Sequence, residues 1–167
     1  MSNLFLFFKK NLLSLLLSLL FLLSNSVFSQ SIKPLRNYTF DQVAENEEVN
    51  YLIIEGCVSL YSAMTELTKE QYPDMASQFF KIANTIYPYG IISLQRIKSL
   101  SNEQAEKEFF QKVNSLTNRY VYEMNETGNK TGSFFEGSFF GEDLKFCQEV
   151  TSSLYSLIKE NFNNSKD

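Results

Sequence analysis

One stretch of the chain, residues 51–67, limits what the rest of the sequence can fold into. Apolar side chains recur in it at steps of four, three, four and three residues: Ile53, Cys57, Leu60, Met64 and Leu67. This spacing places them on one side of an α-helix. Further apolar residues widen that side into a broad face: Ile54, Val58 and Tyr61. A helix with so broad an apolar face must be covered by other helices, so we expect it at the centre of the fold.

The N-terminus has the pattern of a secretory signal peptide. Residues 1–11 contain two lysines and no acid, and residues 12–23 are almost entirely Leu and Phe. Residues 27–29 then place compact side chains at positions −3 and −1 of a cut after Ser29. The alternative is an uncleaved membrane anchor. The apolar run is short for that role, unless residues 4–8 extend it towards the roughly 20 residues that a span needs.

The chain that remains after such a cut is long enough to bury one core of its own. We expect an extended segment over residues 30–39, a helical domain over residues 40–162 and a frayed tail over residues 163–167. Removal of the leader leaves 13 basic and 19 acidic side chains, a net charge of −6. This charge argues against nucleic acid and anionic membrane surfaces as partners. No second long apolar run follows, so we expect no membrane span after signal cleavage.

The chain has two cysteines, Cys57 and Cys147. In a secreted chain a single pair usually forms a disulfide. This bridge would close a loop of about 90 residues, which is worth on the order of 4 kcal/mol in the chain-entropy model. Two buried thiols or a reactive pair are the alternatives, and Lys145 is the one basic residue close to either cysteine. We therefore predict a structural disulfide in a secreted or periplasmic protein, with a bacterial envelope favoured.

Amphipathic patterns predict four helices and no convincing strand. The helices span residues 40–69, residues 73 to about 88, residues 102–124 and residues 142–161. Capping boxes at residues 39–42 and 101–104 open the first and third helices. Pro88 leaves two alternatives open, a kink in the second helix or a separate short helix over residues 89–100. The fold class that follows is an all-α, antiparallel four-helix bundle, in which Cys57 and Cys147 lie on inward faces of neighbouring helices.

The chemistry available to this chain is limited. Histidine is absent, which removes the commonest general base and the usual zinc and haem ligand. Glu45 and Glu48, like Glu103 and Glu106, are spaced as one helical turn, but they fall on the solvated side of their helices. No nucleotide-binding, metal-binding or haem-attachment motif occurs. We therefore predict no catalytic residue, metal or cofactor, and no enzyme.

One predicted loop, residues 125–141, is unusually aromatic. It contains Gly-Ser-Phe-Phe twice. Its phenylalanines, with two tyrosines from the interruption at Pro88, form the candidate binding surface: Phe134, Phe135, Phe139, Phe140, Tyr87 and Tyr89. Either the phenylalanines fold back and plug one end of the bundle, or they form an apolar lip for a hydrophobic ligand or partner protein.

These observations favour a non-catalytic binding or protein-interaction module, whose partner protein the sequence does not identify. The alternative is a carrier that holds a small apolar ligand between its helices. The many aromatic side chains on the predicted inward faces could line such a cavity, although by default they fill a core.

Overall fold

The computed structural model describes residues 32–164, with side chains as far as residue 155. The fold described below is that of the compact unit that begins at Lys33. The predicted signal peptide lies outside the described residues.

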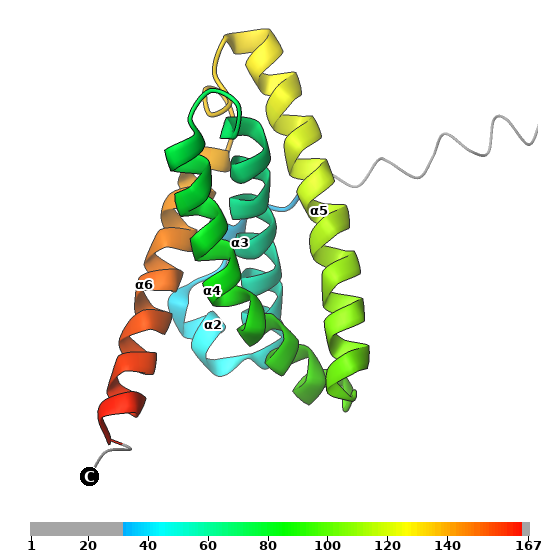
Figure 1. Ribbon diagram of the computed structural model, residues 1–167, viewed down its shortest axis with the longest axis vertical. Helices are drawn as coiled ribbons and strands as arrows, with labels where there is room; N and C mark the ends of the chain where they lie inside the picture. The colour runs from blue at the N-terminus through cyan, green and yellow to red at the C-terminus, as the bar shows by residue number, and fades with distance from the viewer. Residues whose placement is uncertain (1–31, 165–167) are drawn as a thin grey trace, which may run out of the picture. The chain divides into compact units, whose positions relative to one another are not determined.

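The described chain is built from helices. In order they are η1 (Leu35–Asn37), α2 (Phe40–Glu45), α3 (Glu47–Thr68), α4 (Pro73–Lys98), α5 (Asn102–Thr131) and α6 (Phe140–Asn164). The four long helices, α3 to α6, run alternately up and down (Figure 1). Residues 32–164 contain no strand. The predicted all-α helical bundle is confirmed.

Helix α3 lies at the centre, as its broad apolar face predicted. It packs against α4, α5 and α6. Ile53, Cys57 and Leu60 are fully buried, and Met64 is nearly so. Burial on several sides is the expected result for a helix whose apolar residues cover more than one narrow stripe.

The predicted first helix is in fact two helices, because Asn46 interrupts it. Asn46 has extended backbone angles, and its side-chain oxygen accepts hydrogen bonds from the amides of Glu48 and Val49. Asparagine competes with helical hydrogen bonding in this way, so it ends α2 and caps α3. Both predicted capping boxes, opening α2 and α5, are present.

Helix α4 continues through Pro88, which decides between the two alternatives left open by the sequence. Proline has no amide hydrogen to donate to the carbonyl of Asn84, four residues earlier. The helix bends along its second half in Figure 1, as expected where one rung of the hydrogen-bond ladder is missing. Ser99, with a φ of 53°, ends α4 in the left-handed conformation.

Three expectations about where helices begin and end were wrong. Helix α5 runs to Thr131 rather than ending at Met124, and Gly132 ends it with a φ of 80°. The aromatic loop is correspondingly shorter, because α6 begins at Phe140. Within the segment predicted as extended, Leu35–Asn37 form the short helix η1.

Candidate functional site

Helices α4 and α5 are in direct contact where a glycine of α4 faces a phenylalanine of α5. A Cβ atom built on Gly90 would lie 2.1 Å from the ring tip of Phe109, so this ring rests directly on the α4 backbone. The Tyr87 ring, one turn earlier on α4, lies 5.0 Å from the Phe109 ring between centroids. Phe109 itself is fully buried. The two helices are therefore held together near the turn that joins them.

Beyond this contact a groove of about 370 Å³ lies between α4 and α5, with α3 as its floor. The α4 wall consists of Phe80, Ala83, Asn84 and Tyr87. The α5 wall consists of Phe110, Val113, Asn114, Thr117 and Asn118. The floor consists of Val58, Ser62, Thr65 and Glu66. We call this site the α4–α5 groove.

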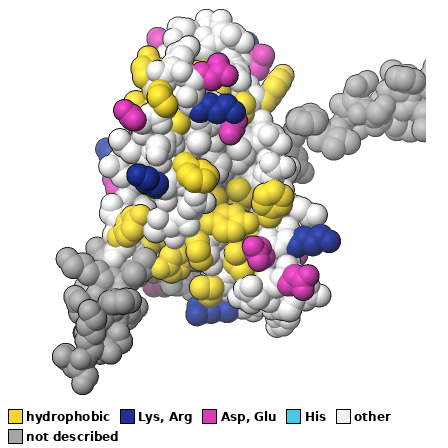
Figure 2. All heavy atoms as spheres, viewed as in Figure 1, with side chains coloured by type: hydrophobic (Ala, Val, Ile, Leu, Met, Phe, Trp, Pro, Cys, Tyr) yellow, Lys and Arg dark blue, Asp and Glu magenta, His cyan; other side chains and the backbone are white. Residues whose placement is uncertain are grey.

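Two large aromatic side chains in the groove are exposed. Phe80 is 56% exposed and Phe110 is 60% exposed, one on each wall. In Figure 2 hydrophobic side chains gather near the middle of the face on which α4 and α5 lie side by side. Apolar surface that is gathered in a hollow and edged by polar groups is typical of a binding site.

The rest of the groove lining combines three apolar side chains, Val58, Ala83 and Val113, with polar side chains that are mostly uncharged. Its polar side chains are carboxamides and hydroxyls, apart from the Tyr87 phenol and Glu66, whose carboxylate lies 2.6 Å from the ammonium of Lys69. Burial raises the pKa of Tyr87, and the negative charge of Glu106 adds to that shift. Tyr87 therefore stays protonated at neutral pH. The lining therefore offers hydrogen bonds and apolar surface.

The aromatic loop is only partly exposed. Phe140 is 2% exposed, and its ring lies 5.9 Å from Tyr120 and 4.6 Å from Phe139 between centroids. Phe134 and Phe139 are half-buried, whereas Phe135 is 36% exposed. The loop thus contributes both to the core and to the surface at its end of the bundle.

The six predicted surface residues do not form one surface. Tyr87 lines the α4–α5 groove, while Tyr89 is half-buried. The second half of α4, which carries both tyrosines, lies towards the opposite end of the bundle from the loop between α5 and α6 (Figure 1).

The sequence reading missed the exposed pair, Phe80 and Phe110. Each follows a second phenylalanine directly, in Phe79-Phe80 and Phe109-Phe110. Adjacent residues of an α-helix point about 100° apart, so two neighbours cannot both face the same partner helix squarely. Two Phe-Phe pairs on consecutive helices were therefore the available signal of an aromatic surface.

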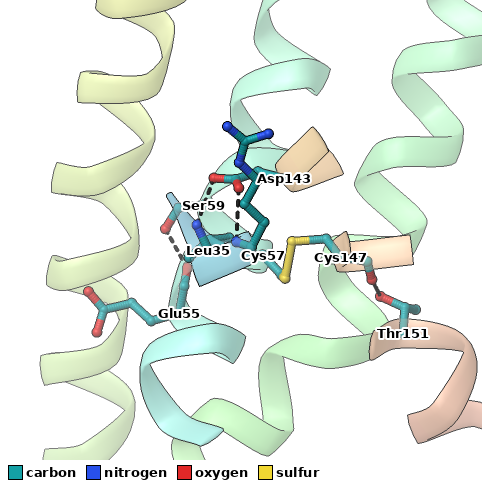
Figure 3. The surroundings of a disulfide bond; sticks show 8 residues. Leu35, Glu55, Cys57, Ser59, Asp143, Cys147 and Thr151 are labelled. Atoms are coloured by element: carbon teal, nitrogen blue, oxygen red, sulfur yellow. Dashed lines mark hydrogen bonds between the residues drawn. A yellow bond between two sulfur atoms is a disulfide. The ribbon is translucent and has the colours of Figure 1, made fainter. Parts of the chain in front are cut away.

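A disulfide fixes α6 to the central helix. Cys57 of α3 and Cys147 of α6 are joined, 90 residues apart in sequence, and both are fully buried (Figure 3). The predicted pairing is confirmed. The bond therefore holds the last helix on α3, whose Val58, Ser62, Thr65 and Glu66 form the groove floor.

A buried carboxylate next to the disulfide ties down η1. Asp143, one turn before Cys147, is fully buried and accepts hydrogen bonds from the amides of Leu35 at 2.9 Å and Arg36 at 3.1 Å (Figure 3). Burial raises the pKa of Asp143, and the two amide hydrogen bonds and the Arg36 charge oppose that shift without cancelling it. Leu35 in turn packs on Gly56, where a Cβ would lie 2.5 Å from a Leu35 methyl carbon.

Two buried tyrosines in the core also have shifted pKa values. Burial raises the pKa of Tyr51 and that of Tyr120, so both phenols stay protonated at neutral pH. Residues 32–164 contain no group of acidic or sulfur-bearing side chains arranged to hold a metal ion. No helix in that range combines the length and the hydropathy needed to cross a bilayer.

Comparisons of the chain with models of protein families, with curated proteins and with solved structures give no match. The function is therefore argued from the α4–α5 groove itself.

Proposed function

We propose that the protein is a non-catalytic binding module that contacts a partner protein through the α4–α5 groove. The observation that carries the proposal is the pair of exposed phenylalanines, Phe80 and Phe110, on facing walls of a largely uncharged hollow. Because Phe80 is 56% and Phe110 is 60% exposed, leaving each ring uncovered forgoes roughly 1–2 kcal/mol relative to full burial. A partner that covers both rings recovers that free energy. The carboxamides beside the rings can form hydrogen bonds that orient the partner.

The compartment follows from the disulfide and the N-terminal pattern. A disulfide, with no described helix able to span a membrane, is compatible with an oxidising compartment. We infer a secreted or periplasmic protein, released by cleavage of the leader after Ser29, with a bacterial envelope favoured. The acidic net charge supports a protein partner over nucleic acid.

A second candidate function is the carriage of a small apolar molecule. The volume of the groove, about 370 Å³, lies within the roughly 300–1,000 Å³ that small-molecule sites occupy. Such a ligand would lie over Val58 and between Phe80 and Phe110, in the groove rather than in the core.

The experiment that tests both candidates compares two double variants. Phe80→Ser with Phe110→Ser removes the exposed rings of the groove. Ile92→Ser with Tyr122→Ser is the matched control, because it also removes one exposed apolar side chain from α4 and one from α5, outside the groove lining. Both variants should keep the helical circular dichroism spectrum of the wild type.

The readout is chemical cross-linking in the native compartment, together with native mass spectrometry of the purified protein. We expect one cross-linked partner in the wild type and the control, and its loss in the groove variant. Equal cross-linking in all three proteins would overturn the proposal. A bound small molecule that disappears only in the groove variant would establish the carrier in its place.

A further inference from the structure

Along the α5 wall, three side chains stand in a row one helical turn apart: Phe110, Asn114 and Asn118. Four residues of α-helix rise about 6.0 Å. An extended peptide chain advances about 6.6 Å every two residues, and successive peptide groups on one edge repeat at that distance. The carboxamides of Asn114 and Asn118 therefore have nearly the spacing of alternate peptide groups in an extended chain.

The α4 wall carries a complementary row: Tyr87, Asn84 and Phe80. The two helices run in opposite directions (Figure 1), and they are in register where Tyr87 packs on Phe109. Further from the connecting turn, Asn84 lies about 4.5 Å along α4 from Tyr87, and Asn114 lies about 7.5 Å along α5 from Phe109. The groove thus presents a carboxamide from each wall at its middle and an aromatic ring towards each end.

Carboxamides on both walls can form more hydrogen bonds with an extended peptide than with a small ligand that has a single ring. A side-chain amide carries both donors and an acceptor, as a peptide group does. An extended segment exposes its N–H and C=O groups along two edges, and a two-walled groove can meet both. The row from Phe110 to Asn118 covers about 12 Å, the length of about four extended residues.

The charges of the lining also limit the ligand. Glu66 is the charged residue among those that line the groove, and none of them is a lysine or arginine. The Glu66 carboxylate is itself paired with the Lys69 ammonium at 2.6 Å, so phosphate groups and acidic peptides would find no unpaired cation in the lining. Uncharged or basic segments carry no such penalty.

We infer that the α4–α5 groove binds an uncharged or basic peptide segment of about four residues in extended conformation, through its main chain. Asn84, Asn114 and Asn118 hydrogen-bond its peptide groups, and Phe80 and Phe110 cover its apolar side chains. This inference rests on the proposed function and names the chemistry of the partner at the same groove.

The test uses an array of N-acetylated, C-amidated hexapeptides, with fluorescence anisotropy on the tightest binders. We expect uncharged and basic sequences among the binders and acidic sequences to be absent. Asn114→Leu, which keeps the side-chain size but removes the amide, should weaken binding about tenfold. Asn125→Leu, an exposed asparagine of α5 outside the groove, is the control and should change nothing.

Methylation of single main-chain nitrogens of the peptide tests the hydrogen bonds directly. Methylation at one position should weaken binding to the wild type about tenfold. The same methylation should change binding to the Asn114→Leu variant little, because the hydrogen bond is already lost in that variant. Peptide binding could instead be unaffected by Asn114→Leu and by N-methylation, but lost in the Phe80→Ser with Phe110→Ser variant. That result would overturn main-chain recognition and leave the groove as the binding site. Binding of oligosaccharides from a glycan array, with no peptide bound, would overturn the peptide class.

Discussion

The ring of Phe109 occupies the space that a side chain on Gly90 would need. A Cβ atom at Gly90 would lie 2.1 Å from Cζ of Phe109. This contact fixes the level at which α5 touches α4. Further from the turn that connects α4 to α5, the two helices form the walls of the α4–α5 groove, with α3 beneath them. Tyr87 begins one wall and Phe110 begins the other. A glycine inside a 26-residue helix is thus part of the construction of the site.

Replacement of that glycine should loosen the packing of α4 on α5. The methyl group of Gly90→Ala meets a fully buried ring, so we expect a loss of about 1–3 kcal/mol in the free energy of unfolding. Gly141→Ala is the control, because its Cβ would meet Phe135 at an ordinary 3.6 Å. Urea unfolding of both variants provides the measurement. A Gly90→Ala protein as stable as the wild type would contradict the account of this contact.

The disulfide should carry much of the stability of the domain. Cys57 and Cys147 close a loop with a sequence separation of 90, so their joint replacement by alanine should cost about 4 kcal/mol. The comparison of urea midpoints for the oxidised wild type and the double alanine variant measures it. A difference below about 1 kcal/mol would mean that helix packing alone holds α6 on α3.

Asp143 should make stability depend on pH in a direction opposite to that of most carboxylates. Its pKa is raised in the folded protein, above an ordinary value of 3.8, so the folded state binds the proton more tightly than the unfolded state does. The resulting stabilisation is complete below about pH 3.8 and is lost as the pH rises through the raised pKa.

The comparison with Asp143→Asn isolates this contribution, because other carboxylates titrate alike in both proteins. The free energy of unfolding of the wild type relative to the variant should decline as the pH rises from 3 to 7. An increase over that range would show that the amide hydrogen bonds from Leu35 and Arg36 outweigh burial in setting the pKa of Asp143.

Two phenylalanines of the aromatic loop should respond very differently to truncation. Phe140 is 2% exposed and packs on Tyr120, so Phe140→Ala should cost about 3–5 kcal/mol. Phe135 is 36% exposed, and Phe135→Ala should cost under about 1 kcal/mol. Thermal unfolding of the two single variants checks both values. Equal losses would mean that the loop acts as one packed unit.

The helices and the disulfide could be predicted because local chemistry decides them. The seam of α3 needs only the helical repeat, and the capping boxes at Thr39 and Ser101 need only residues three apart. The pairing of Cys57 with Cys147 followed from their being the two cysteines of a chain predicted to be secreted, and their positions on two predicted inward faces agreed with it. Tertiary contacts were not needed for any of these conclusions.

The groove could not be predicted in the same way, because it depends on the distance between helices. That distance is set by the fit of the Phe109 ring against Gly90, which no periodicity reveals. Similarly, residues 125–131 fall in the predicted loop, yet α5 continues through them, and Phe134 packs against Gly128. The sequence reading therefore placed the aromatic site in the loop and overlooked Phe80 and Phe110.

The most direct test of the central claim is a photo-cross-linking scan in the native compartment. A benzophenone amino acid replaces one exposed side chain at a time, at Phe80 and Phe110 in the groove and at Ile92 and Tyr122 outside it. If the partner binds in the α4–α5 groove, positions 80 and 110 should give one shared cross-linked product, and positions 92 and 122 should give none. Cross-linking confined to positions 92 and 122, or equal at all four, would contradict it.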